Sequence, residues 1–156
     1  MSFDTIYTAI NVGVMPAWAL LILAPRWSVT HKLVHSLLYP FLYGGLYIAF
    51  LLTAIVFGQS ADDAGMSSIA GVSALFSAPV GVLTGWTHYL AFDLFVGAWI
   101  SRDATSRGIA HWKVIPTLFF TFIFGPTGLF LYGLLRLVSG RGWLISEDTA
   151  RKPTVS

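Results

Sequence analysis

Two ionisable side chains, His88 and Asp93, interrupt an apolar stretch that is long enough to cross a membrane. The surrounding segment, residues 85–104, reads GWTHYLAFDLFVGAWISRDA. An ionisable group inside a membrane helix costs ~2.5–3.5 kcal/mol on insertion scales, and such groups mark function by default. Because burial disfavours the charged form of both side chains, a carboxyl and an imidazole there are suited to exchanging protons near neutral pH. We predict that Asp93 and His88 form an acid–base pair.

The helical period indicates which residues share a face with Asp93. Steps of three and four residues align along a helix, which places Trp86, Tyr89 and Gly97 on roughly that face. Gly97 would let another helix or a ligand approach closely. His88 lies about 140° away around the helix, so the two groups can flank one cavity only from adjacent faces. In the structural alternative, Asp93 only accepts a hydrogen bond from a tyrosine or amide, and His88 lies in the wet interface.

Further polar residues follow in the segment SRDATSRGIAH, residues 101–111. We expect Arg102, Asp103 and His111 to support the site at its mouth. The alternative is a solvated loop whose arginines extend toward lipid headgroups. In the last apolar stretch, FGPTG predicts a kink at Pro126. The neighbouring glycines make room for close helix packing or for a bulky flat ligand, and in the second case we expect Pro126 to contact that ligand.

The histidine spacing raises the question of a metal. His31 and His35 are four residues apart, as two ligands on one helix would be, but no glutamate follows the first histidine as in a zinc protease. The chain has four histidines and no cysteine. We predict no metal and no cofactor. The net charge of +2 comes without a basic cluster, so nucleic acid is not expected as a partner.

The elements that must position these residues are membrane helices. Hydrophobic residues make up 56% of the 156 residues and charged residues only 10%, against roughly a quarter charged in soluble domains. Stretches of about 20 uncharged residues match the ~30 Å hydrocarbon core. The sequence therefore predicts an all-α transmembrane bundle over residues 1–140 and a polar tail over 141–156. Four spans are expected, at residues 5–25, 37–57, 80–100 and 114–136.

Two features complicate this arrangement. Pro79 and its neighbouring glycines break the long apolar region before the third span, which predicts a short interfacial or re-entrant helix near residues 67–77. Lysine and arginine in the first and third loops place those loops inside and the amino terminus outside. Four spans then put the carboxyl terminus outside as well, although Arg136 and Arg141 are basic.

Three segments together resemble a known family: THYLAFDLFVGAWISRDA, then RGI-x-H, and PTLFFTFIFGPTGLFLYGLLR. They are similar to small four-helix membrane proteins whose plant members are required for forming neoxanthin from violaxanthin, and which have bacterial relatives. The resemblance extends from about Asn11 to Arg136. It implies a carotenoid or other isoprenoid as ligand, and an epoxide-opening isomerisation that needs an acid and a base but no redox cofactor.

The first span begins within a few residues of Met1, so we expect a bacterial-type member in the inner membrane rather than a plant protein with a transit extension. Membrane lipid and a hydrophobic small molecule are the expected partners, and a homo-oligomer is left open. Two other functions are also left open. One is a non-catalytic carotenoid or lipid binder, or an accessory protein, and the other is a small transporter.

Overall fold

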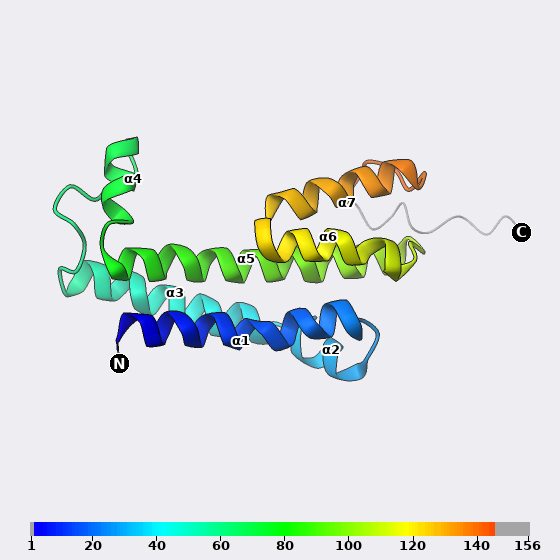
Figure 1. The fold of residues 1–156 in the computed structure, drawn as a ribbon, viewed down its shortest axis with the longest axis horizontal. Coiled ribbons are helices and arrows are strands. Elements are labelled where there is room, and N and C mark those ends of the chain that lie inside the picture. The colour runs from blue at the N-terminus through cyan, green and yellow to red at the C-terminus, as the bar shows by residue number, and fades with distance from the viewer. Residues whose placement is uncertain (1, 146–156) are drawn as a thin grey trace, which may run out of the picture.

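A computed structural model describes residues 2–145 of the chain (Figure 1), and the predicted all-α fold is confirmed. The described part of the predicted 141–156 tail ends at residue 145, and the remainder lies outside the described residues. Within residues 2–145 the chain forms seven helices: α1 (Phe3–Leu23), α2 (Ser28–Leu33), α3 (Leu38–Val56), α4 (Ile69–Leu75), α5 (Pro79–Ser106), α6 (His111–Phe124) and α7 (Pro126–Val138).

The first two predicted spans correspond to long apolar helices. Helix α1 has 21 residues, or about 32 Å at 1.5 Å per residue, and its N-cap Ser2 accepts a hydrogen bond from the Thr5 N–H. Helix α3 has 19 residues and continues the helical stretch Ser28–Val56 that begins with α2. Both stretches are long and apolar enough to cross a membrane.

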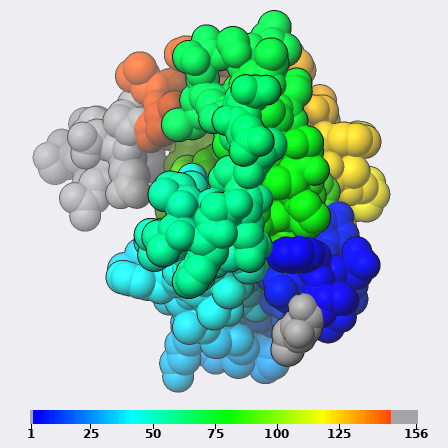
Figure 2. All heavy atoms as spheres, turned by 90° about the vertical axis from the view of Figure 1, so that its left-hand side faces the viewer, coloured from blue at the N-terminus to red at the C-terminus, as the bar shows by residue number. Residues whose placement is uncertain are grey.

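Helix α5 lies at the centre of the bundle and contacts α1, α3, α6 and α7. It has 28 residues with Pro79 in its first turn, where a missing N–H is tolerated. The preceding helix α4 is bent 98° away from α5 and lies, with the loop before it, across one end of the bundle (Figure 2). The short helix predicted near residues 67–77 is therefore present as α4, at nearly a right angle to α5.

The predicted fourth span has a different form from the one expected. Instead of one kinked helix over residues 114–136, α6 and α7 have 14 and 13 residues and fold back on each other as a hairpin (Figure 1). The reversal occurs at Gly125, whose φ of +43° favours glycine, and Pro126 begins the new helix. Each helix measures only about 20 Å, too short to cross ~30 Å of hydrocarbon.

This hairpin returns α7 to the end of the bundle from which α6 began. We call this the cationic end, because every lysine and arginine of residues 2–145 belongs to the loops and helix ends gathered there: Arg26, Lys32, Arg102, Arg107, Lys113, Arg136 and Arg141. The opposite end carries Asp4, Asp62 and Asp63. The positive-inside rule assigns the cationic end to the cytoplasmic side. The expected conflict over Arg136 and Arg141 then disappears, since α7 ends on the same side as the α5–α6 loop.

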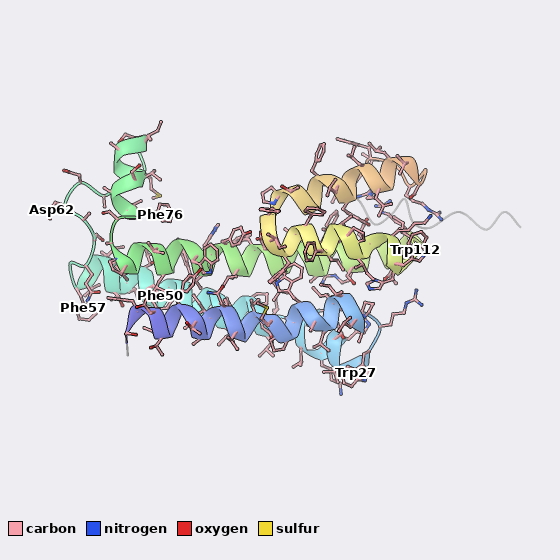
Figure 3. All side chains as sticks on the ribbon, in the orientation of Figure 1. Trp27, Phe50, Phe57, Asp62, Phe76 and Trp112 are labelled. Atoms are coloured by element: carbon pink, nitrogen blue, oxygen red, sulfur yellow. The ribbon has the colours of Figure 1, made fainter. Side chains whose placement is uncertain are left out.

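Aromatic side chains mark both ends. Trp27 and Trp112 lie at the cationic end, and Phe57 and Phe76 lie at the other (Figure 3). Trp27 and Trp112 are exposed, as residues of an interfacial aromatic belt are.

Candidate functional site

Asp93 lies near the middle of α5 and is buried, with 8% of its surface exposed. The tip of the α6–α7 hairpin covers it: a Cβ atom added at Gly125 would collide with the Asp93 carboxylate. Atom Oδ2 of Asp93 is buried and has no hydrogen-bond partner within residues 2–145. The structure therefore brings the one carboxylate inside a predicted span against the hairpin turn, near the middle of α5, with one buried oxygen that accepts no hydrogen bond from the described residues.

Tyr89 lies one turn before Asp93 and connects it to the hairpin. Its hydroxyl donates a hydrogen bond of 2.8 Å to the Ile123 carbonyl oxygen and neighbours the Asp93 carboxylate. The Tyr89 ring lies 5.2 Å from the Trp86 ring, and Trp86 Nε1 donates to Asn11 Oδ1 of α1 at 3.0 Å. The side chains of Asn11, Trp86, Tyr89 and Asp93 thus form a continuous polar and aromatic row between α1, α5 and α6.

Gly97 extends the same face toward the cationic end. A Cβ atom there would come within 2.6 Å of the Trp18 ring, and Trp18 in turn contacts Phe122 of α6 with ring centroids 5.4 Å apart. The close approach that Gly97 allows is therefore used by a tryptophan of α1.

His88 faces elsewhere. It is exposed, and its ring lies 4.5 Å from Phe92 and 5.9 Å from Tyr47 of α3. The rotation of about 140° between positions 88 and 93 explains why one side chain meets the hairpin and the other meets α3. The structure does not bring His88 and Asp93 together.

Asp103, ten residues after Asp93 on α5, lies in a buried ionic cluster at the cationic end. Both of its carboxylate oxygens accept from Arg107 Nε at 2.9 Å, and Oδ2 also accepts from the Tyr132 hydroxyl at 2.6 Å. Arg136 Nη1 lies 3.5 Å from the same oxygen. All four side chains are less than a tenth exposed. Asp103 therefore joins α5 to α7.

The two arginines extend the cluster to the segment after α7. Arg107 donates to the carbonyl oxygens of Arg141 at 2.9 Å and Leu144 at 3.1 Å, and Arg136 donates to Leu144 O at 2.5 Å. The alternative of a solvated loop, with its arginines extended toward lipid headgroups, does not hold for Arg107, which is buried in this ion pair. The i, i+4 spacing of Asp103 and Arg107 was an available signal, whereas Arg136 reaches Asp103 only because the hairpin folds back.

Arg102 and His111 lie apart from Asp93 and make different contacts, whereas Pro126 lies at the hairpin turn that covers Asp93. Arg102 is exposed, with Nη1 3.4 Å from His35 Nδ1. His111 pairs through Nε2 with the Ile22 carbonyl oxygen at 2.9 Å and so ties the start of α6 to the end of α1. Pro126 is exposed beside the hairpin turn, next to Gly125. Within residues 2–145 no group of three or more histidine and acidic residues gathers as a metal site would.

Comparison with known proteins identifies the family of the chain. Residues 5–132 match the family described as ABA DEFICIENT 4-like. The chain is also 21% identical over 110 residues to the protein named "Protein ABA DEFICIENT 4, chloroplastic" of Arabidopsis thaliana. That alignment covers 68% of this chain and 50% of the plant protein, so the chain spans about half the length of the curated relative it matches. No solved structure matches the chain. Since the family match covers most of its length, the chain belongs to the ABA DEFICIENT 4-like family.

Proposed function

We propose that this membrane protein acts on a carotenoid or another isoprenoid by acid–base isomerisation, with Asp93 as the reacting carboxylate. The family relationship supports a hydrophobic substrate, because the plant members that the sequence resembles are required for forming neoxanthin. The position of Asp93 near the middle of the 28-residue helix α5 supports the same class, since a polyene dissolved in the bilayer reaches the middle of a membrane helix without entering water.

The unpartnered Oδ2 atom of Asp93 is the observation that carries the proposal. Leaving a buried acceptor without a hydrogen bond costs about 1–3 kcal/mol. A carboxylate that served only to hold helices together would have both oxygens bonded, as Asp103 has. An open carboxylate oxygen in a low-dielectric site is suited to accepting a proton from a substrate.

The reaction needs one acid and one base. As the acid donates a proton to an epoxide oxygen, the carbon–oxygen bond on the polyene side breaks and the oxygen stays as a hydroxyl. The base removes a proton from the adjacent vinylic carbon, and that electron pair forms the new double bond of an allene. The formula is unchanged, so no electron donor or acceptor is consumed. In place of the expected His88, we assign the acid to Tyr89, whose hydroxyl lies beside Asp93.

A non-catalytic role is the second candidate, and one cavity favours it. A mostly apolar groove of about 550 Å³ lies between α7 and residues 142–145, with Trp99, Phe130 and Trp143 among its walls. A protein that only holds or delivers a pigment would use such a groove and would not depend on the ionisation of Asp93.

A comparison of Asp93→Asn with His88→Gln tests the proposal. Both variants are expressed in cells that supply an epoxide-bearing carotenoid, and the pigments are separated by chromatography. We expect Asp93→Asn to abolish product formation while leaving expression in the membrane intact, and His88→Gln to retain most of it. Turnover by Asp93→Asn would refute the proposal. Loss of turnover in His88→Gln but not in Asp93→Asn would place the reacting group on the face of α5 that meets α3.

A further inference from the structure

A second groove lies toward the cationic end, between the link from α2 to α3 and residues 91–102 of α5. We call it the His35–Arg102 groove. Its volume is about 230 Å³. Polar side chains line one part of it, namely His35, Ser36 and Arg102, and apolar side chains line the other, including Ala91, Leu94 and Phe95.

The polar part combines one positive charge, on Arg102, with the hydrogen-bonding groups of His35 and Ser36. Arg102 Nη1 lies 3.4 Å from His35 Nδ1, and the His35 ring lies 5.1 Å from the ring of His31. No acidic residue lines the groove, and within residues 2–145 Arg102 takes part in no ion pair. A guanidinium with no carboxylate partner favours an anion with several oxygens, since it can donate more than one hydrogen bond to such a group.

The apolar part continues along α5 toward the middle of the bilayer. From Arg102 to Ala91 the helix rises about 16 Å, and the lining changes from charged to fully apolar over that distance. The groove therefore has the polarity profile of one leaflet of the membrane, with the Arg102 guanidinium at its polar end. Neither a free anion nor a neutral pigment matches both parts.

We propose that the His35–Arg102 groove binds the phosphate headgroup of a membrane amphiphile, with Arg102 and His35 on the phosphate and one chain along Ala91, Leu94 and Phe95. This site is separate from Asp93 and does not depend on the proposed isomerisation. The occupant we favour is a lipid of the cytoplasmic leaflet, because the positive-inside rule assigns the cationic end to that side.

Three matched probes separate the headgroup from the chain in protein purified in a non-ionic detergent. Oleoyl lysophosphatidic acid has both parts, glycerol 3-phosphate has only the phosphate, and oleoylglycerol has only the chain. Binding is followed by native mass spectrometry. We expect only lysophosphatidic acid to bind at low concentration. Equal binding of glycerol 3-phosphate would show a soluble anion as the ligand, and equal binding of oleoylglycerol would show no phosphate recognition; either result would overturn the proposal.

Variants then locate the site. Arg102→Gln should weaken lysophosphatidic acid binding by about tenfold or more, as expected for one lost charge-assisted hydrogen bond. Ala91→Leu should weaken it by filling the apolar part. Lys113→Gln, which removes an exposed cation of the same end that does not line the groove, should leave it unchanged. An equal loss of lysophosphatidic acid binding in Lys113→Gln, or unchanged binding in Arg102→Gln, would contradict a specific binding site in the groove.

Discussion

At the scale of single residues, two aspartates of α5 lie in opposite environments. Asp103 accepts hydrogen bonds from Arg107 and Tyr132 and pairs with Arg136, whereas the Oδ2 atom of Asp93 has no partner within residues 2–145. Both are buried, and burial without partners destabilises a carboxylate. We therefore interpret Asp103 as a structural residue and Asp93 as a functional one.

This contrast predicts opposite effects of two Asp→Asn variants on stability. Asp103→Asn should lower the free energy of unfolding by about 3–5 kcal/mol, because it leaves buried guanidinium charge without its carboxylate. Asp93→Asn should leave it unchanged or raise it, because it removes a carboxylate that is not fully bonded. Unfolding in mixed micelles, followed by circular dichroism, measures both. A large loss of stability in Asp93→Asn would assign Asp93 to the structure instead.

Tyr132 provides a milder probe of the same ionic cluster. Tyr132→Phe removes one hydrogen bond to Asp103 and retains the ring that packs edge-on against Trp99. We expect the free energy of unfolding to fall by about 1.5–3 kcal/mol, the range for a hydrogen bond to a charged group, in the same micelle measurement. An unchanged value would mean that the arginines alone satisfy Asp103.

Sequence reasoning at this scale found Asp93, Tyr89 and Trp86 on one face, because the helical period determines that. It did not find that His88 faces α3, since a rotation of about 140° is compatible with either one shared cavity or two separate environments. Nor could it pair Arg136 with Asp103, because that contact crosses two helices and depends on how the chain reverses between them.

At the scale of elements, the α6–α7 hairpin is the feature that places a cover over Asp93. The sequence FGPTG predicts a kink at Pro126 and not the complete reversal that the structure shows, because glycine before proline permits either geometry. The combined length of residues 114–136 also matched one membrane span. The reversal is evident only from the packing of α7 against α6 and the positive φ of Gly125.

Substitution of glycines tests the role of this turn. Gly125→Ala combines an unfavourable φ with a Cβ atom that meets Asp93, so we expect the free energy of unfolding to fall by about 1–3 kcal/mol and turnover to fall with it. Gly133→Ala in α7, where a Cβ atom meets nothing within 4 Å, is the control and should be neutral or stabilising by up to about 1 kcal/mol. Equal effects of the two variants on stability and turnover would argue against a close contact between the Gly125 turn and Asp93.

At the scale of the whole molecule, the hairpin changes the orientation that four spans would impose. All seven described cations gather at one end, and α7 ends there. Three crossings by α1, α3 and α5, with α6–α7 inserted from the cationic end, satisfy the positive-inside rule without exception among these residues.

Cysteine accessibility tests this topology directly, because the chain has no native cysteine. Single cysteines at Ser106 and Ser139 should react with a membrane-impermeant thiol reagent only from the cytoplasmic side, and a cysteine at Ser60 only from the other side. A Ser139 cysteine that reacted from the same side as Ser60 would instead support a fourth crossing.

The central claim is that Asp93 converts a bound isoprenoid into an isomer. Its most direct test is mass spectrometry with chromatographic separation of the pigments that copurify with the wild-type protein and with Asp93→Asn, from cells supplied with an epoxide-bearing carotenoid. We predict two bound isomers of equal mass in the wild type and only the epoxide in the variant. The same two isomers bound to both proteins, or no pigment bound to either, would contradict the claim.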